Sequence, residues 1–302
     1  MPLLDFDGDL IGRALGGMCV LGPEDFQSAH FGAAILAAQF FITDAHLDDI
    51  AARSVRQQAI ELAGRQSRWL HAPIASRPAD PASLAGTLAA GADRLTALGH
   101  DLIFPSIALR LMHERPELAT EAHLDGLARL VEVINREPPG GPFPGWADLD
   151  EAAERPDPSL PSLDSAEELA ATTLQRFIAA GPVHYGMDQG VVHHALTHAL
   201  ALIELDSLGY QAAAARGRLA QRTYLTLLTR RPEMEGALPF VDERCTDVRE
   251  QEWWSTNRRG QLEWLFGHVF KVPWAFRRLV DLAQPDDALP LDRHLSYTLS
   301  AS

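Results

Sequence analysis

The stretch Gly267–Trp274 reads GHVFKVPW and contains a lysine in a chain whose other basic residues are arginine. Among 26 residues of the Lys and Arg types, Lys271 is the only lysine. A guanidinium keeps its proton in proteins, whereas a neutral lysine amine can form a Schiff base or bind carbon dioxide as a carbamate. Lys271 is therefore a candidate for chemistry that arginine cannot perform. The alternative is a surface lysine that survives by chance in an Arg-biased composition.

The neighbours of Lys271 favour the first interpretation. His268 precedes it by three residues, which places both side chains on one side of a helix. Phe270 and Trp274 flank the pair, and burial among such aromatic side chains disfavours a charged ammonium. A neutral lysine beside a metal-binding histidine can take up carbon dioxide and present a carbamate oxygen as a carboxylate would.

A second candidate stretch, GVVHHALTHALALIEL, carries three histidines on an otherwise apolar helix. His194, Thr197 and His198 have the spacing i, i+3, i+4 and share one face, whereas His193 is expected to point elsewhere. Imidazoles and a hydroxyl are costly to bury unless they have partners. The spacing suits metal ligation with a supporting hydroxyl, and a buried hydrogen-bond network is the alternative.

Two further histidines stand on predicted helices. His30 shares its face with the small residues Ala33, Ala34 and Ala37, which leave space in front of the imidazole. His100 stands at the start of a predicted helix, in GHDLIFPSIAL. From local sequence, a structural role is as consistent with each of these histidines as ligation.

Together, these four histidine-bearing helices resemble the questin oxidase-like family, whose members include non-haem iron oxygenases that cleave anthraquinone rings. The family elements H-x-x-T and H-x-x-K match His194/Thr197 and His268/Lys271. The resemblance is carried by motifs scattered over residues 30 to 271. The metal ligands that it implies are His30, His100, His194, His268 and a carboxylated Lys271.

The resemblance also implies an activity, an oxidoreductase that opens a ring of a small polycyclic aromatic, quinone or polyketide-type substrate with dioxygen. Fe(II) is the expected metal, with Mn or Zn as other candidates, and mixed nitrogen and oxygen ligation suits non-haem iron. Thr197 would hydrogen-bond a water on the metal, and His198 would act as a general base, because imidazole titrates near neutral pH. NADPH or a separate partner reductase would prepare the substrate, although the sequence has no nucleotide-binding motif.

Two other functions compete with this one. Helical metal-dependent phosphohydrolases of the HD type use a pattern H…HD…D, for which the matching residues are His71, His100, Asp101 and Asp125. That pattern leaves Lys271 and the His194 helix without a role. The third possibility is a non-catalytic helical ligand-binding protein with structural histidines. A further acidic cluster, DAHLDDI at 44–50, is interpreted as a solvated helix start.

The elements that must position these residues are helices. Apolar residues recur with the helical period, and no alternating strand pattern is present. We predict an all-α fold, one multi-helix bundle over residues 1–302, with a long Pro/Gly/Asp-rich loop near 137–164. The predicted helices cover 23–42, 46–70, 82–98, 101–113, 117–136, 165–180, 188–206, 209–230 and 256–283, with a kink at Pro273.

Bulk composition excludes several classes of function. A formal net charge of −15 argues against binding to nucleic acid or to anionic membranes. Only Cys19 and Cys245 are cysteines, which predicts a reducing cytoplasm, and the acidic start is a poor signal peptide. No apolar run reaches the length of a membrane span. The sequence leaves the oligomeric state open.

Overall fold

The computed structural model describes residues 6–138, 148–180, 187–230, 247–255, 266–286 and 288–300, and these form an all-α fold. Within those ranges the sole extended pairing is an isolated bridge between Pro78 and Thr120. The helices are α1 Gly8–Gly16, α2 Ala29–Asp44, α3 Asp49–Arg65, α4 Ala85–Gly91, α5 His100–Glu114, α6 Glu121–Ile134, α7 Asp148–Glu154, α8 Ala166–Ala179, α9 Met187–Ser207, α10 Gln211–Arg230, α11 Gln251–Ser255, α13 His268–Ala283 and α14 Leu289–Ser300. The predicted fold class is confirmed.

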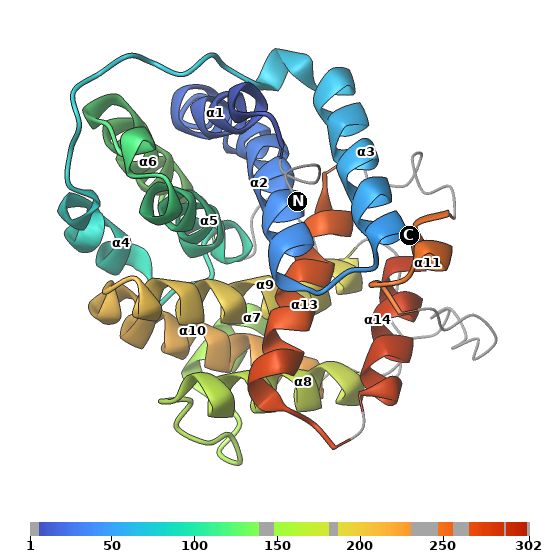
Figure 1. Cartoon of the computed structure of the whole chain (residues 1–302). Helices are drawn as coiled ribbons and strands as arrows, with labels where there is room; N and C mark the ends of the chain where they lie inside the picture. The colour runs from blue at the N-terminus through green and yellow to red at the C-terminus, as the bar shows by residue number, and fades with distance from the viewer. Residues whose placement is uncertain are drawn as a thin grey trace.

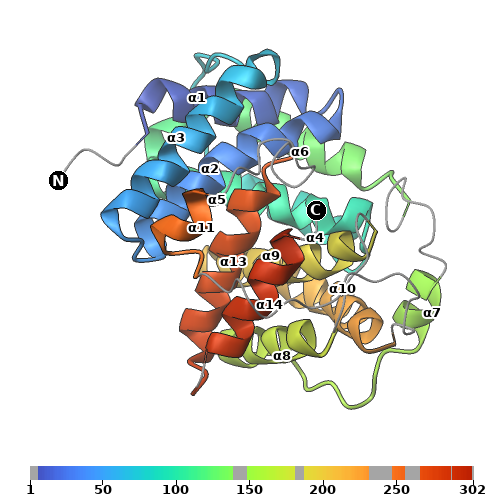
Figure 2. The same ribbon diagram turned by 90° about the vertical axis from the view of Figure 1, so that its right-hand side faces the viewer.

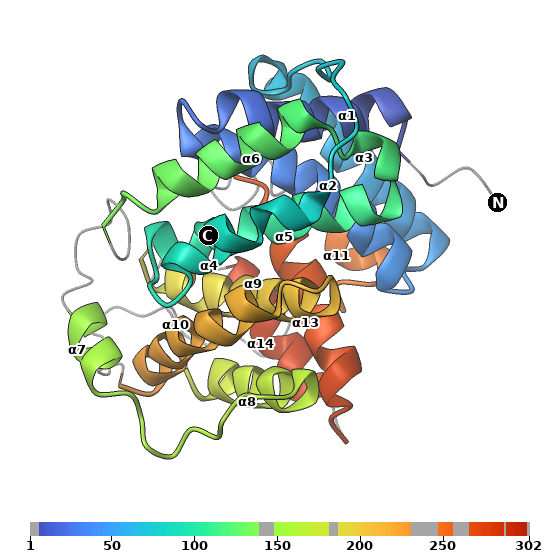
Figure 3. The ribbon, with the colours of Figure 1, turned by 90° about the vertical axis from the view of Figure 1, so that its left-hand side faces the viewer.

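Four helices form the centre of the molecule. Helix α2 packs against α5 and α13, and α9 packs against the same two helices, so the four close a ring of contacts (Figure 1). Outer helices cover this centre: α1 and α3 flank α2, α6 lies on α5, and α8 and α10 lie on α9. Helices α1 and α8 lie at opposite ends of the molecule (Figure 2). From the α1 end, helices α6, α5, α9 and α8 follow one another in that order (Figure 3).

The sequences of two central helices explain their position. Helix α2 is AHFGAAILAAQFFITD, and every residue from Ala29 to Phe41 is buried. A helix that is apolar on all sides has no face for solvent and must lie inside the protein. Helix α9 is also buried around its circumference from Val192 to Ala201. Buried apolar side chains from Phe6 to Leu299 belong to one hydrophobic cluster around these helices.

Helices α5 and α13 begin in the same way, with a histidine after a left-handed glycine. Gly99 has φ +71° and Gly267 has φ +69°, a conformation that costs little only for glycine. A Cβ atom at Gly267 would lie 2.1 Å from Ala34 Cβ, and one at Gly99 would lie 2.6 Å from His198 Cδ2. Backbone conformation and lack of space therefore both require glycine at these two positions. Each glycine sets the direction of the histidine-bearing helix that follows it.

Two predicted boundaries differ from the structure. The predicted loop near 137–164 contains helix α7, because its Ala- and acid-rich sequence favours a helix and Leu149 and Ala152 find burial against α10. The predicted helix 82–98 is reduced to α4, since a tight turn with positive φ at Ala97 and Leu98 precedes α5.

Some predictions concern residues outside the described ranges. These are residues 139–147 of the predicted loop, 256–265 of the last predicted long helix, and Cys245. Cys19 is buried and free. None of the described helices combines enough length with enough apolar character to cross a bilayer.

Candidate metal centre

The four central helices bring the four candidate histidines together. His30 comes from α2, His100 from α5, His194 from α9 and His268 from α13. Ring centroids are 4.5 Å apart for His30 and His100, 4.7 Å for His100 and His194, 5.2 Å for His194 and His268, and 5.5 Å for His268 and His30. The imidazoles therefore form a closed ring of contacts, which we call the histidine cluster.

Lys271 belongs to this cluster. Its side chain is 2% exposed, one turn after His268 in α13. The amine Nζ lies 2.8 Å from Nδ1 of His30 and 5.7 Å from the centre of the Phe104 ring. The interpretation of Lys271 as a surface cation is wrong, because surface lysines keep the ammonium in water. A neutral amine, which carboxylation requires, would accept the proton of His30 Nδ1.

The protons of His100 and His194 can be assigned from their partners. Nδ1 of His194 lies 2.6 Å from the carbonyl oxygen of Gly190, and Nδ1 of His100 makes a very short contact with the carbonyl oxygen of Ala97. A carbonyl oxygen only accepts, so each Nδ1 carries a proton. The tight turn before α5 is what aims the Ala97 carbonyl at the ring.

Both rings are neutral. Burial lowers the pKa of His100 well below its ordinary value. Burial also lowers the pKa of His194, with a further contribution from His100. A neutral imidazole has one proton, and here that proton is on Nδ1. In both rings Nε2 therefore holds a lone pair.

These two lone pairs face each other. Nε2 of His100 lies 3.1 Å from Nε2 of His194, a hydrogen-bond distance without a proton to share. Two nitrogens that each lie about 2.1 Å from one metal ion, at about a right angle, are about 3 Å apart. The distance between the two nitrogens and their unprotonated lone pairs therefore fit a divalent cation between the rings. Each Nδ1–H is held by a backbone carbonyl, as is usual for a metal-bound histidine.

The other candidate donors lie near His100 and His194, but they do not form a complete metal site with them. Within the described ranges, no group of three or more His, Cys, Asp or Glu side chains is arranged as a ready-made metal site. His30 turns Nδ1 toward Lys271, which agrees with that finding. The structure brings the candidate donors together and orients two of them, His100 and His194.

Comparisons of the chain with protein-family models, with curated proteins and with solved structures found no match. The resemblance to the questin oxidase-like family therefore rests on the matched histidines, Thr197 and Lys271.

Thr197 and His198 are placed differently, although the helical period puts both near His194. Thr197 Oγ1 lies 3.3 Å from the carbonyl oxygens of His193 and His194, and the side chain borders a cavity beside the cluster. His198 turns toward α10, where Nδ1 lies 2.8 Å from Oε1 of Gln221. Burial lowers the pKa of His198 to about 4. This position gives no support to a general-base role for His198.

The cavity beside the cluster has room for roughly one water molecule. Its lining residues are His100, Ile103, His193, His194, Thr197, His268, Lys271 and Val272. His193 was expected to point elsewhere, yet it is 1% exposed and borders this space. Since α9 is buried on all sides, its histidines need not share one face to reach the interior. The sequence signal that could have indicated this is the apolar character of the segment VVHHALTHALAL on all sides of the helix.

The residues of the HD pattern do not gather. His100 and Asp101 are buried, whereas Asp125 is exposed on α6 and His71 contacts the carbonyl oxygen of Ala72 near the surface. Burial raises the pKa of Asp101 to about 8, so its carboxyl is protonated at neutral pH. A protonated acid is a poor metal ligand, because the ligand is the carboxylate.

Proposed function

We propose that this protein is a metal-dependent oxygenase whose ion is held by the histidine cluster. The observation that carries the proposal is the pair of bare Nε2 atoms of His100 and His194, 3.1 Å apart in neutral buried rings. Two facing lone pairs in a buried site repel each other, and a cation between them removes the repulsion. His30, His268 and a carboxylated Lys271 would supply the other donors.

Fe(II) is the metal that we assign, with Mn or Zn as alternatives. Imidazole nitrogen together with carbamate oxygen is the donor chemistry of non-haem iron sites. When bound, Fe(II) supplies the capacity to activate dioxygen. The protein contributes neutral imidazole ligands, held by the carbonyls of Ala97 and Gly190, and aromatic rings beside them. Phe104 and Phe266 stand 5.0 and 5.4 Å from the His30 ring, centre to centre.

The proposed substrate is a small polycyclic aromatic, quinone or polyketide-type molecule whose ring is opened, as the motif resemblance suggests. The cavity beside the cluster holds about one water-sized molecule, so an aromatic substrate needs this space to widen. Thr197 Oγ1 borders the cavity and is placed to orient a water there. Incorporation of both oxygen atoms needs no external electrons, whereas incorporation of one needs two electrons, from NADPH or a partner reductase.

Metal analysis of purified protein tests the proposal. We expect Fe near one per chain, and we expect His100→Ala and His194→Ala each to lose it together with oxygen uptake. His123→Ala is the matched control, because His123 is 1% exposed and bonds through Nδ1 to the carbonyl oxygen of Leu118, but lies on α6. It should keep the metal. Full metal content in both cluster variants would refute the assignment.

The same measurements separate the competing functions. Phosphate-ester hydrolysis that disappears in Asp101→Asn, without oxygen uptake in any variant, would identify an HD-type phosphohydrolase. Protein that binds no divalent metal when loaded with Fe(II), Mn(II) or Zn(II) would refute both metalloenzymes and favour a non-catalytic helical binding protein.

A further inference from the structure

A second cavity adjoins the histidine cluster, between α5, α9 and α13. It is lined by Ile103, Ser106, Ile107, Thr197, Leu200, Ala201, Lys271, Trp274 and Ala275, and we call it the apolar cavity. Ile103, Thr197 and Lys271 also line the cavity beside the cluster, so the two spaces share walls. The apolar cavity too has room for roughly one water-sized molecule.

The polar groups in its wall are turned to other partners. Ser106 Oγ donates to the carbonyl oxygen of Ile103 at 2.9 Å, Thr197 Oγ1 lies 3.3 Å from the carbonyl oxygens of His193 and His194, and Lys271 Nζ lies 2.8 Å from His30. A buried water needs two to four polar partners, and apolar cavities stay dry and take up apolar guests. A small apolar molecule therefore suits this space better than water.

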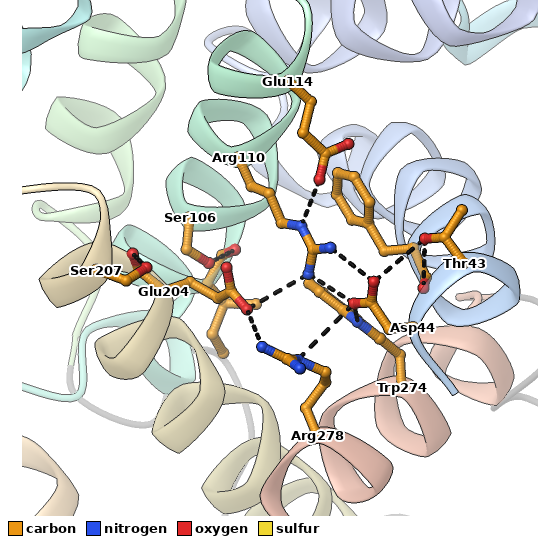
Figure 4. Close-up of polar contacts among 11 residues, drawn as sticks. Thr43, Asp44, Ser106, Arg110, Glu114, Glu204, Ser207, Trp274 and Arg278 are labelled. Carbon is orange, nitrogen blue, oxygen red and sulfur yellow. Dashed lines mark hydrogen bonds and ion pairs between the residues drawn. The ribbon is translucent and has the colours of Figure 1, made fainter. Parts of the chain in front are cut away.

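Trp274 forms the wall opposite the cluster, and its indole is fixed from outside. Nε1 donates to Oδ2 of Asp44 at 2.9 Å, and Asp44 pairs with Arg110 at 2.7 Å. Arg110 in turn reaches Glu114 at 3.0 Å and Glu204 at 3.4 Å (Figure 4). The side chain of Glu114 is 46% exposed, so this charged network leads to solvent. Trp274 separates the apolar cavity from this charged network.

We propose that the apolar cavity is a dioxygen-binding site from which dioxygen reaches the histidine cluster. A diatomic apolar molecule matches the size of the space and the satisfied polar groups of its wall, and Thr197 and Lys271 stand at the boundary with the cluster. The use of dioxygen for reaction rests on the proposed function. Occupancy of the cavity by the gas does not, so the two can be tested apart.

The test uses metal-free protein and dioxygen itself as the probe. Methyl NMR spectra under oxygen pressure report how closely the paramagnetic gas approaches each methyl group. Relaxation enhancement at Ile103 and Ile107 should be at least about threefold larger than at Ile35 and Ile134, because close-packed interiors leave little space for a guest. Ile35 and Ile134 are 0% exposed, so they control for burial alone. Equal enhancement at all four residues would overturn the proposal.

Two variants change the cavity in opposite directions. Ala201→Leu fills the space and should reduce the enhancement at Ile107, which lines the apolar cavity but not the cavity beside the cluster, to the level of Ile35. Ile107→Ala enlarges it and should increase the enhancement at Ile103. Unchanged enhancement in both variants would overturn the site even if the wild-type signal is present. A strong signal in protein that never binds metal would leave the gas site standing and refute the oxygenase.

Discussion

Lys271 is the residue whose chemistry is most open to direct measurement. As the only lysine of the chain, it is the only side chain able to form a lysine carbamate. Its position beside His30, at 2% exposure, requires either a buried ammonium or a neutral amine. A buried ammonium and a neutral amine predict different effects of substituting Lys271. Variants at this position therefore test the proposed metal ligands.

We predict that Lys271→Met keeps the fold but loses metal and oxygen uptake, because methionine matches the stem and lacks the amine. Lys271→Arg should lose metal and also destabilise the protein by about 2–4 kcal/mol, since a guanidinium cannot be neutralised when buried. Metal analysis and urea unfolding measure the two effects.

A direct readout is carbon NMR with labelled bicarbonate. Wild-type protein should give a carbamate signal that is absent from Lys271→Met. Near-neutral stability and retained metal in Lys271→Arg would contradict the carbamate, because only an exposed cation tolerates that exchange.

Asp101 permits a pH-dependent test of the HD alternative. Burial raises the pKa of its carboxyl to about 8 in the folded protein, so folding favours the protonated acid and stability falls as pH rises toward 8. Asp101→Asn removes this pH-dependent contribution to the free energy of unfolding. We expect the variant to keep its metal and to gain about 1.4 kcal/mol per pH unit over wild type between pH 6 and 8, measured by urea unfolding. Metal loss would instead indicate that Asp101 is a ligand.

Among the elements, α13 depends on the glycine that precedes His268. We predict that Gly267→Ala lowers the free energy of unfolding by about 2–4 kcal/mol, because a left-handed backbone is combined with a Cβ contact to Ala34. Gly209→Ala is the control for backbone strain alone: Gly209 has φ +93° and nothing within 4 Å of a built Cβ. It should cost about 1 kcal/mol.

Chemical denaturation of these variants separates crowding from strain. Adding Ala34→Gly to Gly267→Ala should recover part of the loss, since it removes the atom 2.1 Å from the new Cβ. Equal destabilisation in Gly267→Ala and Gly209→Ala would show that the close approach of α2 and α13 has no energetic role. Such a result would weaken the argument that this glycine positions His268.

For the molecule as a whole, the charged network binds together the same four helices that carry the histidine cluster. Asp44 lies on α2, Arg110 on α5, Glu204 on α9 and Arg278 on α13 (Figure 4). Arg278 lies 3.8 Å from Asp44 and 3.7 Å from Glu204. Nearby Arg110 lowers the pKa of Asp44 against the opposing effect of burial. The network therefore fixes the helices at a second level, on the far side of Trp274 from the cluster.

Removal of Arg110 tests that role. The side chain is 13% exposed, and its loss would leave Asp44 and Glu204 with the longer contacts to Arg278 as their shared ion pairs. We expect Arg110→Met to lower the free energy of unfolding by about 2–4 kcal/mol. Arg77→Met is the control, because the Arg77–Glu121 pair is 84% and 46% exposed and should contribute less than about 1 kcal/mol. Urea unfolding measures both variants. Similar losses of unfolding free energy in Arg110→Met and Arg77→Met would contradict a role of the network in fixing the four helices.

The sequence by itself determined the fold class and much of the donor set. Helical periodicity depends on local spacing, so the histidines at 30, 100, 194 and 268 could be assigned to helices without knowledge of their neighbours. The i, i+3 relation of His268 and Lys271 is likewise local. The chemistry that a neutral lysine can perform follows from its residue type. The absence of a nucleotide-binding motif is likewise visible in the sequence pattern alone.

The tertiary structure decided which side chains meet, because contacts between helices depend on packing and on the relative shift and rotation of each pair. His198 turns to Gln221 although it is one turn from His194, while His193 borders the cavity. Asp44 was interpreted as part of a solvated helix start, yet it joins Arg110 from another helix. Burial, tautomer and the 3.1 Å between His100 and His194 also arise only when α5 packs on α9.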